Sequence, residues 1–336
     1  MTAIIALENV SKRFVRPLGL AEKTANLLGA KYHEAVVHAL DEVSFEVGEG
    51  EIVGLVGESG CGKSTLGRII AGIYPPTAGR VTFRGSEEIS GLSEGKAALK
   101  IQMIFQDPMG SLNPRMRVAD IVGEAPVAHG IVSKAEASDY VDAMLLRVGL
   151  DPVYKARYPH QFSGGQRARI GIARALAVNP DFLVCDESVA ALDVSIQAQV
   201  LNLFMQLRQD FGLTYLFISH DLGVVEHLSQ RIVIMYLGRV VEIAPTEELF
   251  RSANHPYTQA LLANVPRLEA KKQRFQPIKG EVPSPINPPS GCHFHPRCPF
   301  VMPRCRVERP ALRPIGPGRL SACHLNDVMA DAAPAA

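Results

Sequence analysis

The sequence has almost no net charge and no long apolar run. Its 336 residues carry 35 Lys and Arg against 34 Asp and Glu, so no overall positive field points to nucleic acid as a partner. No apolar run approaches the roughly 20 residues of a membrane span, and no basic and then apolar leader is visible. With 47% hydrophobic and 21% charged residues, the composition predicts a globular protein that stays in the cytoplasm.

Cysteine is scarce and unevenly placed. Cys61 and Cys185 lie in apolar surroundings, where we expect small buried side chains. Eleven of the 24 prolines fall in residues 276–320, so this segment cannot be mainly helix or central strand. Disulfides are rare in cytoplasmic proteins, which predicts another use for the four cysteines of residues 292–323. They are Cys292, Cys298, Cys305 and Cys323.

Residues 57–65 read GESGCGKST and fit the pattern G-x-x-x-x-G-K-[ST]. The apolar run 52–56 predicts a buried strand before this loop, and residues 66–71 predict a helix after it. Backbone N–H groups in such a loop form a cradle for phosphate, so we predict a nucleoside triphosphate site. Lys63 is expected to reach the β- and γ-phosphates and Ser64 to ligate Mg²⁺. The loop residues expected at the nucleotide are Gly57, Glu58, Ser59, Gly60, Cys61, Gly62, Lys63, Ser64 and Thr65.

The rest of the chain predicts an α/β fold. Residues 15–37 predict a loop or a short helix, and residues 108–176 are mainly helical in pattern, as are residues 196–210. Strands that alternate with helices indicate a mostly parallel sheet. The expected strands span residues 4–14, 43–47, 52–56, 81–83, 181–186 and 213–219, with a hairpin at 232–243.

Two further patterns carry chemistry. Asp186 ends an apolar strand, where a carboxylate can hold the Mg²⁺ shell, and the adjacent Glu187 can deprotonate a water for in-line attack. Residues 162–166 read FSGGQ, in which Ser163 is a good N-cap and two glycines leave N–H groups open before a helix. This is a second anion site, although a single short chain rarely needs two cradles for one nucleotide.

Together these motifs resemble those of the ATP-binding subunits of ABC transporters, over about residues 4–265. Residues 57–65 resemble the Walker A motif, 163–166 the signature, 182–186 Walker B and 191–193 the D-loop. The resemblance implies an ABC-type P-loop NTPase domain at residues 1–265. Such a domain has a RecA-like core, an antiparallel β subdomain and a helical subdomain, here about 108–176. A small Cys- and Pro-rich extension would follow at residues 266–336.

The resemblance also implies roles for single residues. Glu187, His220, Gln106 and Lys63 would be catalytic: Gln106 in the Q-loop would sense Mg²⁺ and the attacking water, and His220 would contact the γ-phosphate. Phe14 either stacks on adenine or is an ordinary core residue, because an insertion and His38 follow it. Asp193 of the D-loop would also lie at the nucleotide.

Family members pack head to tail and sandwich two ATP molecules, so the signature would act on ATP held by a partner chain. This explains two phosphate cradles in one chain. Residues 188–191 read SVAA where many members have PTSA, and Phe162 replaces Leu, but neither change removes a catalytic group. The signature residues expected to act in trans are Ser163, Gly164, Gly165 and Gln166.

The C-terminal region resembles the extension of oligopeptide/dipeptide importer ATPases, through HPYTQALL at 255–262 and GCHFHPRCPFVMPRC at 291–305. This implies an ATPase that energises a membrane importer of di- or oligopeptides, or of a related nickel chelate, glutathione or oligosaccharide cargo. The implied partners are a paralogous ATPase subunit, two permease subunits that dock near residues 106–117 and, indirectly, a substrate-binding protein. The implied location is peripheral, on the cytoplasmic face of the inner membrane.

The four tail cysteines follow the spacing C-x5-C-x6-C-x17-C. This fits neither the short pairs of zinc ribbons nor ferredoxin spacing, so it indicates a four-thiolate site without naming the metal. The resemblance suggests a [4Fe–4S] cluster in at least some members, with Zn²⁺ and free buried thiols as the alternatives. Competing ligands would be His293, His295 and His324.

Two other function classes are open to an ABC-type ATPase. A soluble member acting in DNA repair or translation usually has two cassettes or long coiled-coil insertions, whereas this chain has one cassette and no long heptad run. A non-hydrolysing regulatory cassette is disfavoured by Glu187 and His220.

Overall fold

The computed structural model describes residues 2–85, 87–89, 99–107, 110–264, 278 and 280–327. The predicted domain boundary at 265–266 lies outside these residues, as do residues 108 and 109 of the expected docking segment. Among the helices described, none is long and apolar enough to cross a membrane.

A central sheet organises the chain, with strand order β11-β12-β10-β9-β3-β8-β7-β6. Its strands from β9 to β6 run parallel to one another. β3, β7 and β8 are buried at every position, which is typical of parallel strands covered on both faces. The predicted α/β core is therefore confirmed. The parallel strands are β3 (Ile52–Val56), β6 (Ile101–Ile104), β7 (Phe182–Asp186), β8 (Thr214–Ser219) and β9 (Arg231–Tyr236).

Helices cover both faces of this sheet. Because side chains alternate along a strand, Val184 packs in the cluster that contains Leu66 of α2 (Lys63–Ile70). Its neighbour Leu183 packs in the opposite cluster with Phe204 of α7 (Val194–Phe211). Helix α8 (Leu222–Leu228) lies against β3 and β8.

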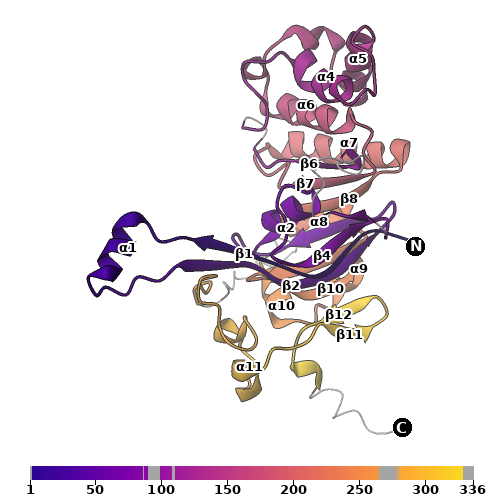
Figure 1. Ribbon diagram of the computed structural model, residues 1–336. Helices are drawn as coiled ribbons and strands as arrows, with labels where there is room; N and C mark the ends of the chain where they lie inside the picture. The colour runs from indigo at the N-terminus through magenta and orange to yellow at the C-terminus, as the bar shows by residue number, and fades with distance from the viewer. Residues whose placement is uncertain are drawn as a thin grey trace.

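The helical subdomain forms one end of the molecule, beyond β6 and α7 (Figure 1). It contains most of the segment for which the sequence predicts helix. α4 packs against α5, and both contact α6, so α6 carries the subdomain back towards the central sheet. Its elements are α4 (Val118–Ala128), α5 (Ala137–Arg147), η2 (Pro152–Ala156), η3 (Pro159–Gln161) and α6 (Gly164–Leu176).

An antiparallel sheet of order β2-β1-β4-β5 packs beside the core. The prediction of a loop or a short helix at 15–37 is partly correct: a short helix forms there, but the first two strands continue as a paired ribbon to Arg16 and Ala35. Helix α1 (Leu20–Leu27) sits at the tip and projects away from the body (Figure 1). Inter-strand pairing extends these strands beyond what their own sequence indicates. The strands are β1 (Ala3–Arg16), β2 (Ala35–Gly48), β4 (Ala78–Phe83) and β5 (Glu87–Glu88).

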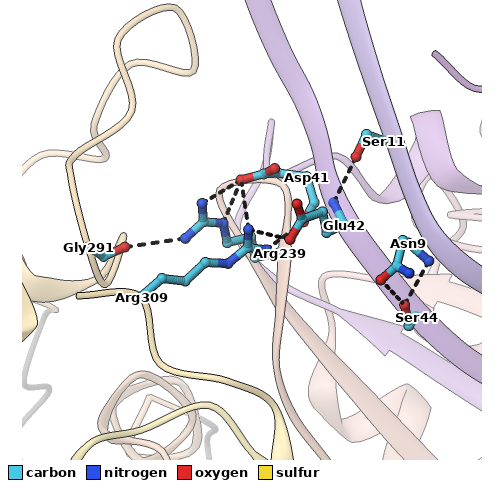
Figure 2. A network of polar contacts seen from close by, with 8 residues as sticks. All are labelled: Asn9, Ser11, Asp41, Glu42, Ser44, Arg239, Gly291 and Arg309. Atoms are coloured by element: carbon cyan, nitrogen blue, oxygen red, sulfur yellow. Dashed lines mark hydrogen bonds and ion pairs between the residues drawn. The ribbon is translucent and has the colours of Figure 1, made fainter. Parts of the chain in front are cut away.

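The C-terminal segment joins the central sheet. β12 pairs with β10 through Ile243 and Leu320, which adds two edge strands to the sheet. An ion pair fastens the same segment to β2, since Arg309 binds Glu42 at 2.6 Å, and beside it Arg239 of the central sheet binds Asp41 (Figure 2). The elements are β10 (Arg239–Pro245), α9 (Thr246–Arg251), α10 (Pro256–Leu262), η4 (His295–Arg297), α11 (Pro303–Val307), β11 (Arg313–Gly316) and β12 (Arg319–Ser321).

Candidate functional site

Four predicted site residues follow parallel strands of the central sheet. The loop at Gly57 follows β3, Gln106 comes shortly after β6, Glu187 follows β7 and His220 follows β8. The carboxyl ends of parallel strands lie at one edge of a sheet, which is where open α/β sheets bind ligands. The topology thus brings together residues that are far apart in the sequence.

The loop of residues 57–65 borders a cavity of about 310 Å³. Residues 59–60 and 62–65 line this cavity together with Gln106 and Glu187. Val37, Ala39 and Pro285 line it too, and no motif predicted them as site residues. We call this cavity the phosphate cavity.

Two loop glycines are enforced by neighbouring backbone. A Cβ on Gly57 would lie 2.2 Å from the carbonyl oxygen of Met235. Gly62 has a φ of +109°, and its Cβ would lie 2.4 Å from the carbonyl oxygen of Ala39. Atoms cannot approach so closely, so these positions require glycine even before an anion is considered.

Lys63 lies folded over the loop and is only 4% exposed. Its Nζ donates hydrogen bonds to the carbonyl oxygens of Gly57 (2.7 Å) and Glu58 (3.1 Å). Beside it, the Ser64 hydroxyl donates to Oδ1 of Asp186 at 2.9 Å. Burial raises the pKa of Asp186, and the hydrogen bond from Ser64 acts in the opposite direction. Ser64 and Asp186, two of the three residues expected at Mg²⁺ with Gln106, are therefore already in contact.

The Glu187 carboxylate is the meeting point of the other predicted catalytic groups. Gln106 donates from Nε2 to its Oε2 at 2.7 Å, and Nδ1 of His220 lies 3.3 Å from the same oxygen. Glu187 has a φ of +46°, a conformation that costs energy for a residue with a side chain and that persists where its surroundings hold it. Its backbone N–H is held by the carbonyl oxygen of Ile218.

Phe14 lies at the rim of the phosphate cavity and is 38% exposed. Its ring meets Tyr74 edge to face, with centroids 5.8 Å apart, and Nζ of Lys12 lies 5.2 Å from the ring. The Phe14 side chain is too exposed for an ordinary core residue. The nearby His38 donates its backbone N–H to the carbonyl oxygen of Pro285.

The second anion site lies apart from the first. Ser163 caps α6, as the sequence predicts: its Oγ accepts from the backbone of Gln166, whose side chain accepts from the Ser163 N–H. A Cβ on Gly165 would lie 2.4 Å from Ile196, so α6 begins tightly against α7. Asp193 precedes α7 and is exposed. Among the described residues that line the phosphate cavity, none comes from 163–166.

The four tail cysteines line one small apolar cavity, which we call the thiol pocket. All are free thiols, and burial raises the pKa of Cys292 and of Cys323 to about 11. His295 and His324 line this pocket, whereas Nδ1 of His293 lies 3.0 Å from the carbonyl oxygen of Leu237. No three His, Cys, Asp or Glu side chains within the described ranges are arranged to hold a metal ion.

Sequence reasoning missed two residues that hold the phosphate loop. The hydroxyl of Tyr257 accepts the backbone N–H of Glu58 at 2.9 Å, and Arg297 forms an ion pair with the Glu58 side chain. These partners lie 199 and 239 positions from Glu58. No spacing rule connects residues so far apart.

Comparison with known proteins identifies two matching families. The family described as "ABC transporter" matches residues 40–190, and "Oligopeptide/dipeptide transporter, C-terminal region" matches residues 241–305. A putative oligopeptide transport ATP-binding protein of Bacillus subtilis is 54% identical over 86% of this chain and 90% of its own length. The oligopeptide transport ATP-binding protein AppF of the same organism is 48% identical over 96% and 97%.

Two solved structures share the fold. An ATP-binding cassette, solved as a dimer in a post-hydrolysis state with ADP and Pi, is 28% identical with a TM-score of 0.60. It covers 72% of this chain and 98% of its own. The cbiO1 protein of Clostridium perfringens, part of the ABC transporter complex cbiONQ, is 26% identical with a TM-score of 0.61. It covers 75% of this chain and 92% of its own.

The close packing of Gly62 against the Ala39 backbone predicts that Gly62→Ala weakens nucleotide binding. The added methyl would collide with the Ala39 carbonyl, and relief of that clash moves the loop. We expect the Kd for ATP to rise at least about tenfold and the free energy of unfolding to fall by about 1–3 kcal/mol, as measured by ATP titration and denaturant unfolding. Gly171→Ala is the control, since a Cβ there meets open space; equal effects of the two substitutions would contradict this view.

Proposed function

The chain belongs to the ABC transporter family of ATP-binding proteins and is an ATPase, and from this premise we propose that it energises a membrane importer of di- or oligopeptides. The observation that carries the proposal is the shared contact at Glu187. Gln106 and His220 reach one carboxylate oxygen beside the phosphate cavity. Such a carboxylate is placed to accept a proton from a water that attacks the γ-phosphate.

We propose that the substrate is ATP bound with Mg²⁺ in the phosphate cavity. Lys63 exchanges its two carbonyl contacts for the β- and γ-phosphates, which are stronger partners for an ammonium group. Ser64 and Asp186, now hydrogen-bonded to each other, would hold Mg²⁺ together with Gln106, and the ion would neutralise phosphate charge. Phe14, exposed at the rim, stacks on the adenine.

We propose that the active unit is a head-to-tail dimer with a second, paralogous ATPase chain. The exposed start of α6 (Ser163 and Gly164) supports this assembly, because its N–H groups are oriented for an anion that this chain does not supply. Gly165 and Gln166 would act on the partner's nucleotide with them, and Asp193 would also lie at the nucleotide. The dimer reported for one cassette with ADP and Pi provides a precedent.

Peptide cargo is favoured by the match of residues 241–305 and by the relatives' names. We propose two permease subunits that dock near residues 106–117, a substrate-binding protein outside, and a peripheral position on the cytoplasmic face of the membrane. Residues 1–265 would form the nucleotide-binding domain and 266–336 the extension. A nickel chelate, glutathione or oligosaccharide is the alternative cargo.

Glu187→Gln should lower ATP turnover by about 10²–10⁴-fold, because an amide cannot accept the proton of the attacking water. ATP binding should persist, since Lys63 and the loop are unchanged. Release of phosphate by the purified chain, with its partner where required, is the measurement. The matched control is Glu226→Gln, at an exposed position of α8. Near-normal turnover in the Glu187 variant would refute the assignment of the base.

Co-purification tests the transport role. A tagged copy of the chain, isolated from gently solubilised membranes, should retain a permease pair and a second ATPase chain in a nucleotide-dependent way. Recovery with ribosomes or DNA and without membrane subunits would instead support a soluble ABC ATPase. The identity of the co-purified binding protein would narrow the cargo.

We also propose that the thiol pocket binds a [4Fe–4S] cluster, with Zn²⁺ as the alternative. Support comes from the donors, because four free thiols line one cavity. Thiolates bind both iron–sulfur clusters and zinc. Such a centre would stabilise a segment rich in proline and poor in apolar core.

Metal analysis of anaerobically purified protein tests this assignment. A cluster predicts iron and sulfide together with broad visible absorption, and Cys305→Ser should remove the absorption. Cys185→Ser, which alters a buried thiol outside the pocket, is the control and should retain it. Stoichiometric zinc in a colourless protein would select the alternative, and a metal-free folded tail would reject both.

A further inference from the structure

Arg297 of the tail reaches the phosphate loop. Its two terminal nitrogens bind the two carboxylate oxygens of Glu58 at 2.6 and 3.0 Å, a paired geometry that carboxylates favour. The side chain of Arg297 is 4% exposed and that of Glu58 is 24% exposed. Water therefore screens this pair less than it screens an ion pair on the surface.

Aromatic side chains hold Arg297 in place. Its Nη1 donates to the hydroxyl of Tyr236 at 3.4 Å, and Tyr236 packs against Tyr257 with ring centroids 4.7 Å apart. The Tyr257 hydroxyl in turn binds the backbone N–H of Glu58. Glu58 is thus held through both its side chain and its backbone.

The position of Glu58 explains why this contact matters. Glu58 belongs to the loop that is expected to cradle a triphosphate, and its carbonyl oxygen accepts a hydrogen bond from Lys63. An unpaired carboxylate at this point would repel the phosphates. Arg297 neutralises that charge and fixes the residue that carries it. The next residue, Cys298, lines the thiol pocket, so the residue that contacts the phosphate loop and a cysteine of the thiol pocket are consecutive in the chain.

We propose that Arg297 is a positioning residue of the nucleotide site, through which the cysteine-bearing tail sets the affinity of the phosphate loop for ATP. This inference rests on the proposed ATP site and adds a determinant of ATP affinity that lies outside the loop motif. Displacement of the segment that carries Arg297 and Cys298 removes the balancing charge from Glu58 and weakens ATP binding.

The test is a double-mutant cycle that compares ATP binding by full-length variants of Arg297 and Glu58. Arg297→Ala should raise the Kd for MgATP about tenfold, within the range of coupling measured for paired residues. Arg297→Lys should have a smaller effect, because the charge remains but the paired geometry is lost. Glu58→Gln should raise the Kd less than Arg297→Ala does, because it leaves no unpaired anion beside the phosphates, and its combination with Arg297→Ala should recover most of the lost affinity. For the Arg297 variants the turnover at saturating ATP should change much less than the Kd, because the interaction acts on binding.

A second tail arginine provides the matched control. Arg309 also pairs with the cassette, through Glu42, but it is not among the residues that line the phosphate cavity, so Arg309→Ala should leave the Kd nearly unchanged. An unchanged Kd in folded Arg297→Ala or Arg297→Lys, or no recovery in the double variant, would overturn the inference. If Arg297→Ala does not fold, Arg297→Lys and Glu58→Gln still decide the question. Failure of the wild-type chain to bind ATP would instead reject the proposed function.

Discussion

The phosphate loop is held by backbone atoms that leave no space for a side chain. The carbonyl oxygens of Met235 and Ala39 lie within van der Waals reach of Gly57 and Gly62. One of these carbonyls belongs to the central sheet and the other to the antiparallel sheet, so the loop is fixed at the junction of the two. The positions of Lys63 and Ser64 depend on this packing because both begin the helix that the loop introduces.

A single edge of the central sheet then supplies the chemistry. Gln106, Glu187 and His220 come from three strand ends, and a change in the register of any one strand would separate them. The strained backbone of Glu187 is consistent with such a position, since strain persists only where the surrounding structure holds it. The signature at Ser163 belongs to another part of the molecule and lies outside this arrangement.

Local motifs made much of the fold and site predictable. The glycine loop, the capped signature helix and the acidic strand end each carry their own pattern, and parallel strand order explains why they converge. The long ribbon of β1 and β2, the pairing of β12 with β10 and the contact between Glu58 and Arg297 were not predicted. They depend on complementarity between distant segments, for which neither periodicity nor spacing gives a signal. The cysteines of the tail show an intermediate case, because their clustering in the sequence indicated a common site but not its geometry.

The addition of β12 to the central sheet has a consequence for biosynthesis. β10 is buried at most of its positions, and its outer edge is covered by residues that the ribosome adds about 80 positions later, since Glu242 pairs with Ser321. An uncovered apolar strand edge is a template for pairing with another chain. The nascent cassette therefore passes through a period in which its sheet is open on this side, and a chaperone or early binding of a partner would protect it from association with other copies.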